Sequence, residues 1–224
     1  ACVLAECNIL VTGLSDTGKS VLLNVLGNFI PEYEFIVTIE ESEELMLQQK
    51  AVACLHTRPP NIENKGTITQ QDLLAHIQQM RPERILIGEV KGEEVFDLLT
   101  SIVPCMTTLR ARDPEDALYQ LEPLYLMGDE KRPIQAVRSR IAERVDLIVH
   151  IDRLQTGYRR LSSISEVDYV DEQYQVRPIF QFELLPPDEE GFRKGLFHAV
   201  NRPTERFLRR IGQYTNNDEL IESI

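Results

Sequence analysis

Short apolar runs and amphipathic segments alternate along the first two thirds of the chain. Runs such as Phe35–Ile39 and Leu147–Ile151 are rich in β-branched residues, which is typical of buried strands. Gln70–Met80 has the spacing of a helix, and Thr69 is a candidate N-cap. The alternation predicts an α/β fold, a doubly wound and mostly parallel sheet flanked by helices. The expected strands are residues 8–12, 35–39, 51–55, 84–89, 105–109 and 147–151, and the expected helices are 21–26, 70–80, 93–101 and 133–144, with another opened by Asp113 and Pro114.

The pattern changes in the last third of the chain. Residues 158–167 and 173–183 are strand-like and are separated by a turn near residues 168–172, which predicts an antiparallel hairpin added to the sheet. A polar loop at 186–191, a short basic helix at 204–212 and a frayed tail at 216–224 complete the expectation. We therefore divide the chain into a main domain, residues 1–185, and a C-terminal extension, residues 186–224.

The segment between the first strand and the first helix fits the phosphate-binding pattern G-x-x-x-x-G-K-[ST]. In such a loop, backbone N–H groups point into a concavity, and the helix N-terminus adds partial positive charge. Lys19 is expected to reach the β- and γ-phosphates of ATP, and the Ser20 hydroxyl is expected to coordinate Mg²⁺. The candidate nucleotide-binding residues are Gly13, Leu14, Ser15, Asp16, Thr17, Gly18, Lys19, Ser20 and the following Val21.

Three charged residues stand at the carboxyl ends of expected strands, where ligands of doubly wound sheets bind. They are Glu40, Glu89 and Arg110. A carboxylate in this position can hold Mg²⁺ through water or polarise the attacking water. Glu89 is the first candidate catalytic residue and metal ligand, and Glu40 is the second. The alternative for each carboxylate is a solvated strand end.

Composition narrows the functional classes. The net charge of −12 disfavours nucleic acid and anionic lipid as general partners. The apolar runs are too short to span a membrane, and the start without Met suggests a fragment of a longer protein. Asn64–Thr67 resembles a guanine-specifying motif but lacks its Asp, so GTP has little support. The cysteines have no C-x-x-C spacing, which favours reduced, buried thiols over a zinc site.

Several stretches resemble the secretion ATPases of bacterial type II and type IV secretion and pilus assembly, most of all the tight-adherence (Tad/CpaF) pilus ATPases. The stretches are residues 38–45, 57–66, 80–92 and 179–183. The resemblance implies a RecA-like motor domain over residues 1–185, with Lys19 and Ser20 as the Walker A pair and Glu89 as the Walker B glutamate. It also implies that Glu40 belongs to an acidic box and that Arg58 lies in a loop near the nucleotide.

The same resemblance implies partners and a location. Family members form hexameric rings with ATP between subunits, so we expect self-association of the full-length protein. They work at inner-membrane platform proteins of secretion systems, which implies a cytoplasmic location peripheral to the inner membrane. An N-terminal domain is expected to precede the present sequence. Arg58 and the basic helix, with Arg206, Arg209 and Arg210, are candidates for contacts with a neighbouring subunit.

The chain also departs from the family pattern around the catalytic centre. Leu14 and Asp16 replace glycines of the phosphate loop, and Arg110 stands where the family has a histidine. Arginine can clamp a phosphate but cannot replace histidine in proton transfer. Further departures are Arg112 for asparagine, Lys91 for arginine, Gln79 for arginine, and the shorter Ile102–Cys105 in place of the first part of the histidine box.

Two functional hypotheses follow. In the first, the chain is an ATPase motor domain that couples ATP binding and hydrolysis to pilus assembly or protein secretion. In the second, it is a catalytically degenerate nucleotide-binding subunit that assembles with a competent partner. The phosphate loop and Glu89 favour the first hypothesis, whereas Arg110 and the shortened histidine box favour the second.

Overall fold

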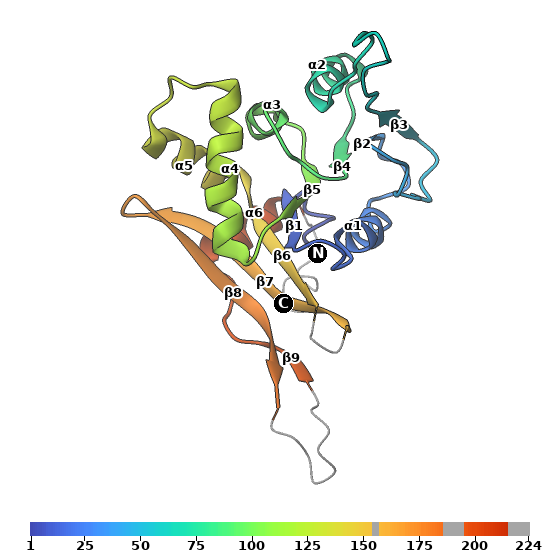
Figure 1. Ribbon diagram of the computed structural model, residues 1–224. Helices are drawn as coiled ribbons and strands as arrows, with labels where there is room; N and C mark the ends of the chain where they lie inside the picture. Colours follow the sequence, from blue (N-terminus) through green and yellow to red (C-terminus); the bar gives the residue numbers. More distant parts are fainter. Residues whose placement is uncertain (154–156, 186–194, 215–224) are drawn as a thin grey trace.

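The computed structural model describes residues 1–153, 157–185 and 195–214 (Figure 1). The strands are β1 (Ile9–Gly13), β2 (Ile36–Glu40), β3 (Val52–His56), β4 (Arg84–Ile87), β5 (Cys105–Arg110), β6 (Leu147–Arg153), β7 (Arg159–Val170), β8 (Gln173–Leu184) and β9 (Gly195–Ala199). The helices are α1 (Lys19–Gly27), α2 (Gln70–Met80), α3 (Glu94–Thr100), α4 (Pro114–Gly128), α5 (Ile134–Arg144) and α6 (Glu205–Tyr214). The expected alternation of strands and helices is confirmed.

All nine strands belong to one sheet in the order β3-β2-β4-β5-β1-β6-β7-β8-β9. The strands from β3 to β6 are parallel, and the antiparallel part begins where β7 pairs with β6. β1 lies between β5 and β6, with Gly13 in register with Arg110 and Thr12 in register with His150. This arrangement confirms the expected mostly parallel α/β sheet with an antiparallel hairpin.

Each face of the sheet has its own hydrophobic core. One core joins the sheet to α2, α3, α4 and α5 through residues such as Leu74, Leu98 and Ile141. The other joins it to α1 and α6 through Leu23, Phe207 and Ile211. Because both faces are covered, the parallel strands are buried nearly throughout, which explains their continuous apolar sequences.

The helix N-termini follow the local sequence signals. Thr69 accepts a hydrogen bond from the Asp72 backbone N–H, and the Asp72 carboxylate accepts one from the Thr69 backbone N–H, which completes a capping box. Asp113 caps α4, where it accepts a hydrogen bond from the Asp116 backbone N–H at 2.7 Å. Both N-cap expectations are confirmed. No helix in the described part of the chain is long and apolar enough to cross a bilayer.

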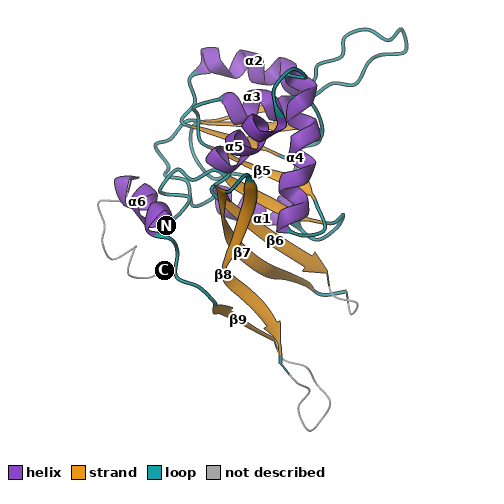
Figure 2. Cartoon of the chain, turned by 90° about the vertical axis from the view of Figure 1, so that its left-hand side faces the viewer, coloured by secondary structure: helices purple, strands orange, loops and turns teal. Residues whose placement is uncertain are grey.

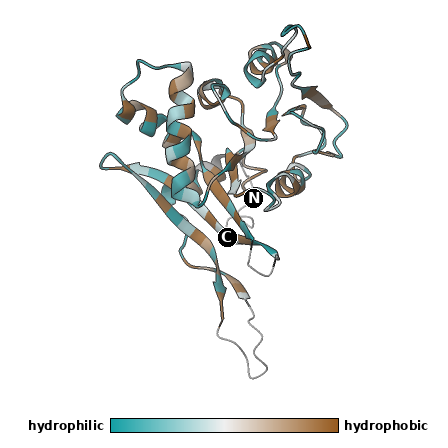
Figure 3. Ribbon diagram, viewed as in Figure 1, coloured by the Kyte–Doolittle hydropathy of each residue, from teal (hydrophilic) through white to brown (hydrophobic). Residues whose placement is uncertain are grey.

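The C-terminal hairpin is longer than the sequence suggested. β7 and β8 extend to a two-residue turn at Asp171 and Glu172, both with positive φ, and both strands extend away from α2 and α3 (Figures 1 and 2). Hydrophobic and hydrophilic positions are interspersed along them (Figure 3), as expected for strands outside the buried part of the sheet. A further strand, β9, which was not predicted from the sequence, pairs with β8. The expected loop at 186–191 and tail at 216–224 lie outside the described residues.

The expectation that all four cysteines are buried is wrong. Cys7 and Cys105 are buried, and burial raises the pKa of the Cys105 thiol to about 12. Cys54 is exposed, because β3 is the outermost strand on its side of the sheet and has a partner only on the β2 side. Cys2 is half-buried.

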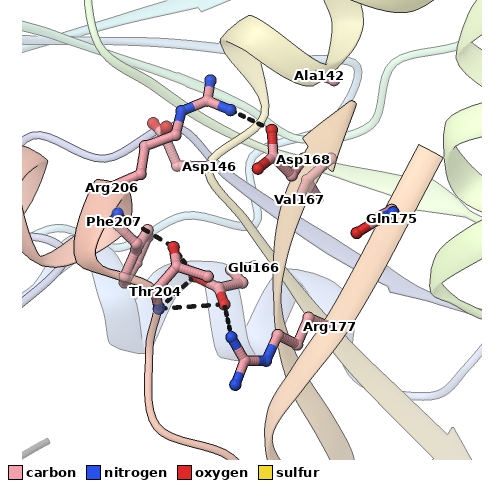
Figure 4. A pocket seen from close by; sticks show the side chains of 10 residues that line it. All are labelled: Ala142, Asp146, Glu166, Val167, Asp168, Gln175, Arg177, Thr204, Arg206 and Phe207. Carbon is pink, nitrogen blue, oxygen red and sulfur yellow. Dashed lines mark hydrogen bonds and ion pairs between the residues drawn. The ribbon is translucent and has the colours of Figure 1, made fainter. Parts of the chain in front are cut away.

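A polar hollow marks the junction between α6 and the sheet (Figure 4). Glu166 on β7 is buried there and accepts hydrogen bonds from the Thr204 backbone N–H and hydroxyl at 3.1 and 2.9 Å. Arg177 lies 3.6 Å from the same carboxylate, and Arg206 pairs with Asp168. Since these charged groups are paired with one another, we assign the hollow a structural role in attaching α6.

A buried ion pair connects the chain ahead of β2 to the start of β4. The Arg84 side chain donates to the two oxygens of Glu34 from Nε and Nη2, at 2.6 and 3.3 Å. Arg84 is 1% exposed and Glu34 is 6% exposed, so neither charge is well solvated. Removing one partner of such a pair leaves the other charge buried and uncompensated.

We therefore expect Glu34→Ala to lower the free energy of unfolding by about 3–5 kcal/mol. Glu32→Ala is the matched control, because Glu32 is two residues away and forms an exposed pair with Lys50. The control substitution is expected to lower the free energy of unfolding by less than about 1 kcal/mol. Urea denaturation followed by circular dichroism measures both values. Equal effects of the two substitutions would contradict the argument from burial.

Candidate functional site

The phosphate loop connects the end of β1 to the start of α1 and has a defined shape. Gly18 has φ 95°, which an L-residue rarely adopts, and it stands at the N-terminus of α1. The Leu14 carbonyl accepts hydrogen bonds from the Thr17 hydroxyl at 2.9 Å and from Lys19 Nζ at 3.1 Å. The lysine ammonium therefore lies across the mouth of the loop.

Gly13 fixes how closely the loop approaches the rest of the sheet. It has φ 151°, and a Cβ atom at this position would lie 2.4 Å from the Ile151 carbonyl oxygen of β6. Such an atom would also lie 2.7 Å from the Thr17 hydroxyl. Both neighbours belong to well-buried parts of the structure, so only glycine fits here.

The two expected carboxylates line one polar cavity with Lys19 and Ser20, of about 170 Å³. Glu40, the last residue of β2, is 2% exposed, and its Oε1 accepts hydrogen bonds from the backbone N–H groups of Glu44 and Leu45 at 3.0 and 2.9 Å. Its Oε2 is buried without a hydrogen-bond partner among the described residues. Glu89 follows β4, and its Oε1 lies 3.7 Å from Lys19 Nζ.

Lys19 is in an unusual electrostatic environment. Its side chain is 9% exposed, and this burial lowers the pKa of Lys19 from its ordinary value. The carboxylate of Glu89 partly offsets the decrease in pKa, whereas the positive charge of Arg110 adds to it. An ammonium that is poorly solvated gains more than an exposed one from an incoming phosphate anion.

Arg110 and Arg58 occupy different places relative to the loop. Arg110 ends β5, is exposed, and is in register with Gly13, so it lies at the edge of the site. Arg58 lines a separate hollow, where its Nε donates to the Gly66 carbonyl at 2.6 Å. That hollow shares Glu41 and Lys91 with the polar cavity, so the two spaces adjoin.

Arg159 lies at the phosphate loop and was not predicted from the sequence. It begins β7, and its Nε donates to the Asp16 carbonyl at 2.8 Å. The two residues are 143 positions apart, and no motif surrounds Arg159 in the sequence. Only the antiparallel pairing of β7 with β6 brings this guanidinium to the loop.

The oxygen atoms of this cavity suit a magnesium ion. The Ser20 hydroxyl, the unpartnered Glu40 Oε2 and the Glu89 carboxylate are hard oxygen donors of the kind that Mg²⁺ prefers. The described residues contain no group of three or more His, Cys, Asp or Glu side chains arranged to hold a metal ion. A bound Mg²⁺ would therefore take several of its ligands from phosphate and water.

Comparisons with known proteins identify the family of the chain. A family model described as type II/IV secretion system protein matches residues 1–177. The chain belongs to this family. A putative conjugal transfer protein of Mycobacterium tuberculosis is 32% identical over 167 residues, which cover 73% of this chain and 47% of that protein. Protein VirB11 of Agrobacterium fabrum is 28% identical over 156 residues, covering 66% and 45%. The chain thus spans about half the length of the curated relatives it matches.

Solved structures support the RecA-like fold. The VirB11 ATPase from the Brucella suis type IV secretion system, crystallised with sulphate, has a TM-score of 0.65 at 26% identity. The match covers 73% of this chain and 49% of that one. The Legionella pneumophila ATPase DotB has a TM-score of 0.53 at 16% identity, covering 75% and 47%, which supports the fold alone. The expected fold class and the expected type II/IV secretion family are confirmed.

Asp16 is the residue of the phosphate loop whose charge and backbone conformation bear most directly on phosphate binding. Its φ is 60°, a conformation that glycine adopts without strain and that aspartate tolerates at some cost. The residue is exposed, and its negative charge slightly offsets the decrease that burial causes in the pKa of Lys19, so the carboxylate lies close enough to act on the phosphate site. The charge opposes an incoming phosphate anion.

We expect Asp16→Gly to tighten ATP binding by about threefold to tenfold at low salt, since it removes a nearby negative charge. Asp16→Asn is the matched variant, because it removes the charge and still tolerates positive φ. Most of the gain should appear in both variants and shrink as salt increases. Isothermal calorimetry at two salt concentrations measures it. Unchanged affinity in both variants would mean that the carboxylate does not act on the phosphates.

Proposed function

We propose that the chain is the ATP-binding motor domain of a Tad/CpaF-like secretion ATPase, which couples ATP binding and hydrolysis to pilus assembly or protein secretion. One observation carries the proposal: Lys19 lies between the Leu14 carbonyl and the Glu89 carboxylate, at a cavity that also contains the unpartnered oxygen of Glu40. A buried ammonium beside oxygen donors for a cation suits a magnesium–triphosphate complex. The ATPase named among the solved relatives supports the same chemistry.

In this proposal each side chain has a defined task. Lys19 exchanges the Leu14 carbonyl for phosphate oxygens, and loop N–H groups from Gly13 to Val21 surround the phosphates. Glu89 holds the attacking water and accepts its proton, since it lies beside Lys19 and is partly exposed. A bound Mg²⁺ would neutralise charge on the phosphates. Glu40 would orient water around the cation through Oε2.

Arg110 is assigned a role as a phosphate clamp. It lies at the open edge of the site, where a guanidinium can reach the terminal phosphate without entering the loop. Arg58, which binds the Gly66 carbonyl in the adjoining hollow, is better placed to meet a nucleotide held by a neighbouring subunit. We therefore propose a ring, a hexamer in the full-length protein, with each nucleotide at a subunit boundary.

The proposal includes a cellular setting. The conjugal transfer and VirB11 names of the relatives support a role in a secretion system, with inner-membrane platform proteins as partners. We propose a cytoplasmic location peripheral to that membrane. The net charge of −12 supports partners other than nucleic acid.

A second candidate function has a specific observation in its favour. None of the described residues that line the polar cavity is a histidine, and the resemblance implies that Arg110 stands where the family has a histidine. A nucleotide-binding but hydrolysis-poor subunit that assembles with a competent partner would fit this composition.

Nucleotide binding is tested with Lys19→Ala. The substitution removes the ammonium that faces the phosphates, and we expect loss of measurable Mg·ATP and Mg·ADP binding in calorimetry. Lys65→Ala is the control, because Lys65 is an exposed lysine with only an exposed partner, Glu63. Equal affinity of wild type and Lys19→Ala would refute the nucleotide-binding proposal.

Hydrolysis is tested with Glu89→Gln, assayed as steady-state phosphate release. We expect retained ATP binding and a loss of turnover of about a hundredfold or more, the usual contribution of a general base. Arg110→His is the complementary variant, and it should raise turnover if the missing histidine limits the wild type. Wild-type turnover at background that only Arg110→His increases would favour the second candidate function. Strong turnover that survives Glu89→Gln would refute the role of Glu89.

A further inference from the structure

A second hollow lies beside the phosphate loop and shares none of its lining residues with the polar cavity. It has a volume of about 260 Å³ and adjoins Thr17 and Gly18 of the loop. Its walls are mainly apolar and come from α1, β6 and β7: Val21, Val25, Ile151 and Leu161. We name it the α1–β7 hollow.

The α1 wall of this hollow is exposed in an unusual way. Val21 is 66% exposed and Val25 is 47% exposed, although α1 otherwise packs into a core through Leu23. The two valines are four residues apart, so they form one continuous apolar strip on the helix. An apolar strip that adjoins a polar phosphate loop is typical of sites for small ligands.

Arg159 stands at the boundary between the loop and the hollow. Its Nε is engaged with the Asp16 carbonyl at 2.8 Å, and its Cδ lies 3.4 Å from where a Cβ atom on Gly18 would be. The planar end of the side chain is thereby held at the entrance of the hollow, and no carboxylate among the described residues forms an ion pair with it. A guanidinium plane in such a place is a stacking partner for an aromatic ring.

The direction of a bound nucleotide follows from the two sides of the loop. Lys19, Ser20 and Glu89 face the polar cavity, which is therefore the end for the terminal phosphate and its cation. Gly18 and Val21, at the start of α1, line the α1–β7 hollow instead, together with Arg159. We propose that the α1–β7 hollow binds the nucleoside end of the nucleotide. The base lies on the Val21–Val25 strip, with Arg159 stacked on its other face.

This assignment rests on the proposed nucleotide-binding function and adds to it a residue outside the phosphate loop. It makes Arg159 a binding residue for the base and not for the phosphates. The distinction can be measured, because inorganic tripolyphosphate carries the phosphates of ATP without the nucleoside.

The experiment is calorimetry with Mg·ATP and with Mg·tripolyphosphate. Wild type should bind ATP more tightly than tripolyphosphate, and Arg159→Ala should weaken ATP binding by about tenfold while changing tripolyphosphate binding less than twofold. Val25→Ser should weaken the binding of ATP, but not of tripolyphosphate, by about threefold. Val25→Leu, which keeps the position apolar, should bind ATP as tightly as the wild type does. Arg209→Ala is the control, because Arg209 is an exposed arginine that pairs with Glu205 on α6. Circular dichroism verifies that each variant is folded.

Three results would overturn the assignment. Equal weakening of both ligands by Arg159→Ala would make Arg159 a phosphate ligand. Equal wild-type affinity for ATP and tripolyphosphate would show that the nucleoside contributes nothing to binding, so the hollow would not bind it. Loss of selectivity in Val25→Leu as well as Val25→Ser would remove the apolar strip from the site. If wild type binds neither ligand, the proposed nucleotide-binding function itself fails, which is a different outcome from all three.

Discussion

The position of β1 between β5 and β6 is the constraint on which the site depends. β1 is buried along its whole length and pairs in parallel with both neighbours, so its last residue, Gly13, has a fixed height relative to both. Backbone hydrogen bonds also fix the segment that follows β4. The Gly88 N–H donates to the Ile39 carbonyl of β2, and the Val90 N–H donates to the Thr108 carbonyl of β5. The loop and the carboxylates therefore reach one edge of the sheet by register alone.

Two lysines neutralise the carboxylates at that edge of the sheet, and they differ in how far they are exposed to solvent. Lys19 and Lys91 both lie near Glu89, at 3.7 and 3.6 Å, and Lys91 also binds Glu41 at 2.9 Å. Among the lysines in the described part of the chain, Lys19 alone is buried, and its hydrogen bond to the Leu14 carbonyl occupies the opening of the loop. Although the chain has a net charge of −12, the poorly solvated ammonium of Lys19 is placed where a phosphate can replace the Leu14 carbonyl as its partner.

Local sequence signals were sufficient for most of the fold, because apolar strands, N-caps such as Thr69 and Asp113, and the phosphate loop are defined by neighbouring residues. The rule that ligands bind at strand ends also selected Glu40 and Glu89, which lie in one cavity with Lys19. The contacts between residues far apart in the sequence could not be predicted from it. Arg159 reaches the loop from 143 residues away, and β9 is a five-residue strand defined by its pairing with β8.

The close approach of Gly13 to Ile151 has a consequence for how the molecule folds during synthesis. Asp146, at the start of the β6 segment, accepts a hydrogen bond from Asn8, 138 residues earlier. Because β1 is synthesised well before β6, it must wait for β6 before its second edge is paired. Loop closure over such distances slows folding, and an unpaired apolar strand is prone to aggregation in the interval. The phosphate loop is encoded near the start of this sequence but reaches its final support only after about two thirds of it has been made.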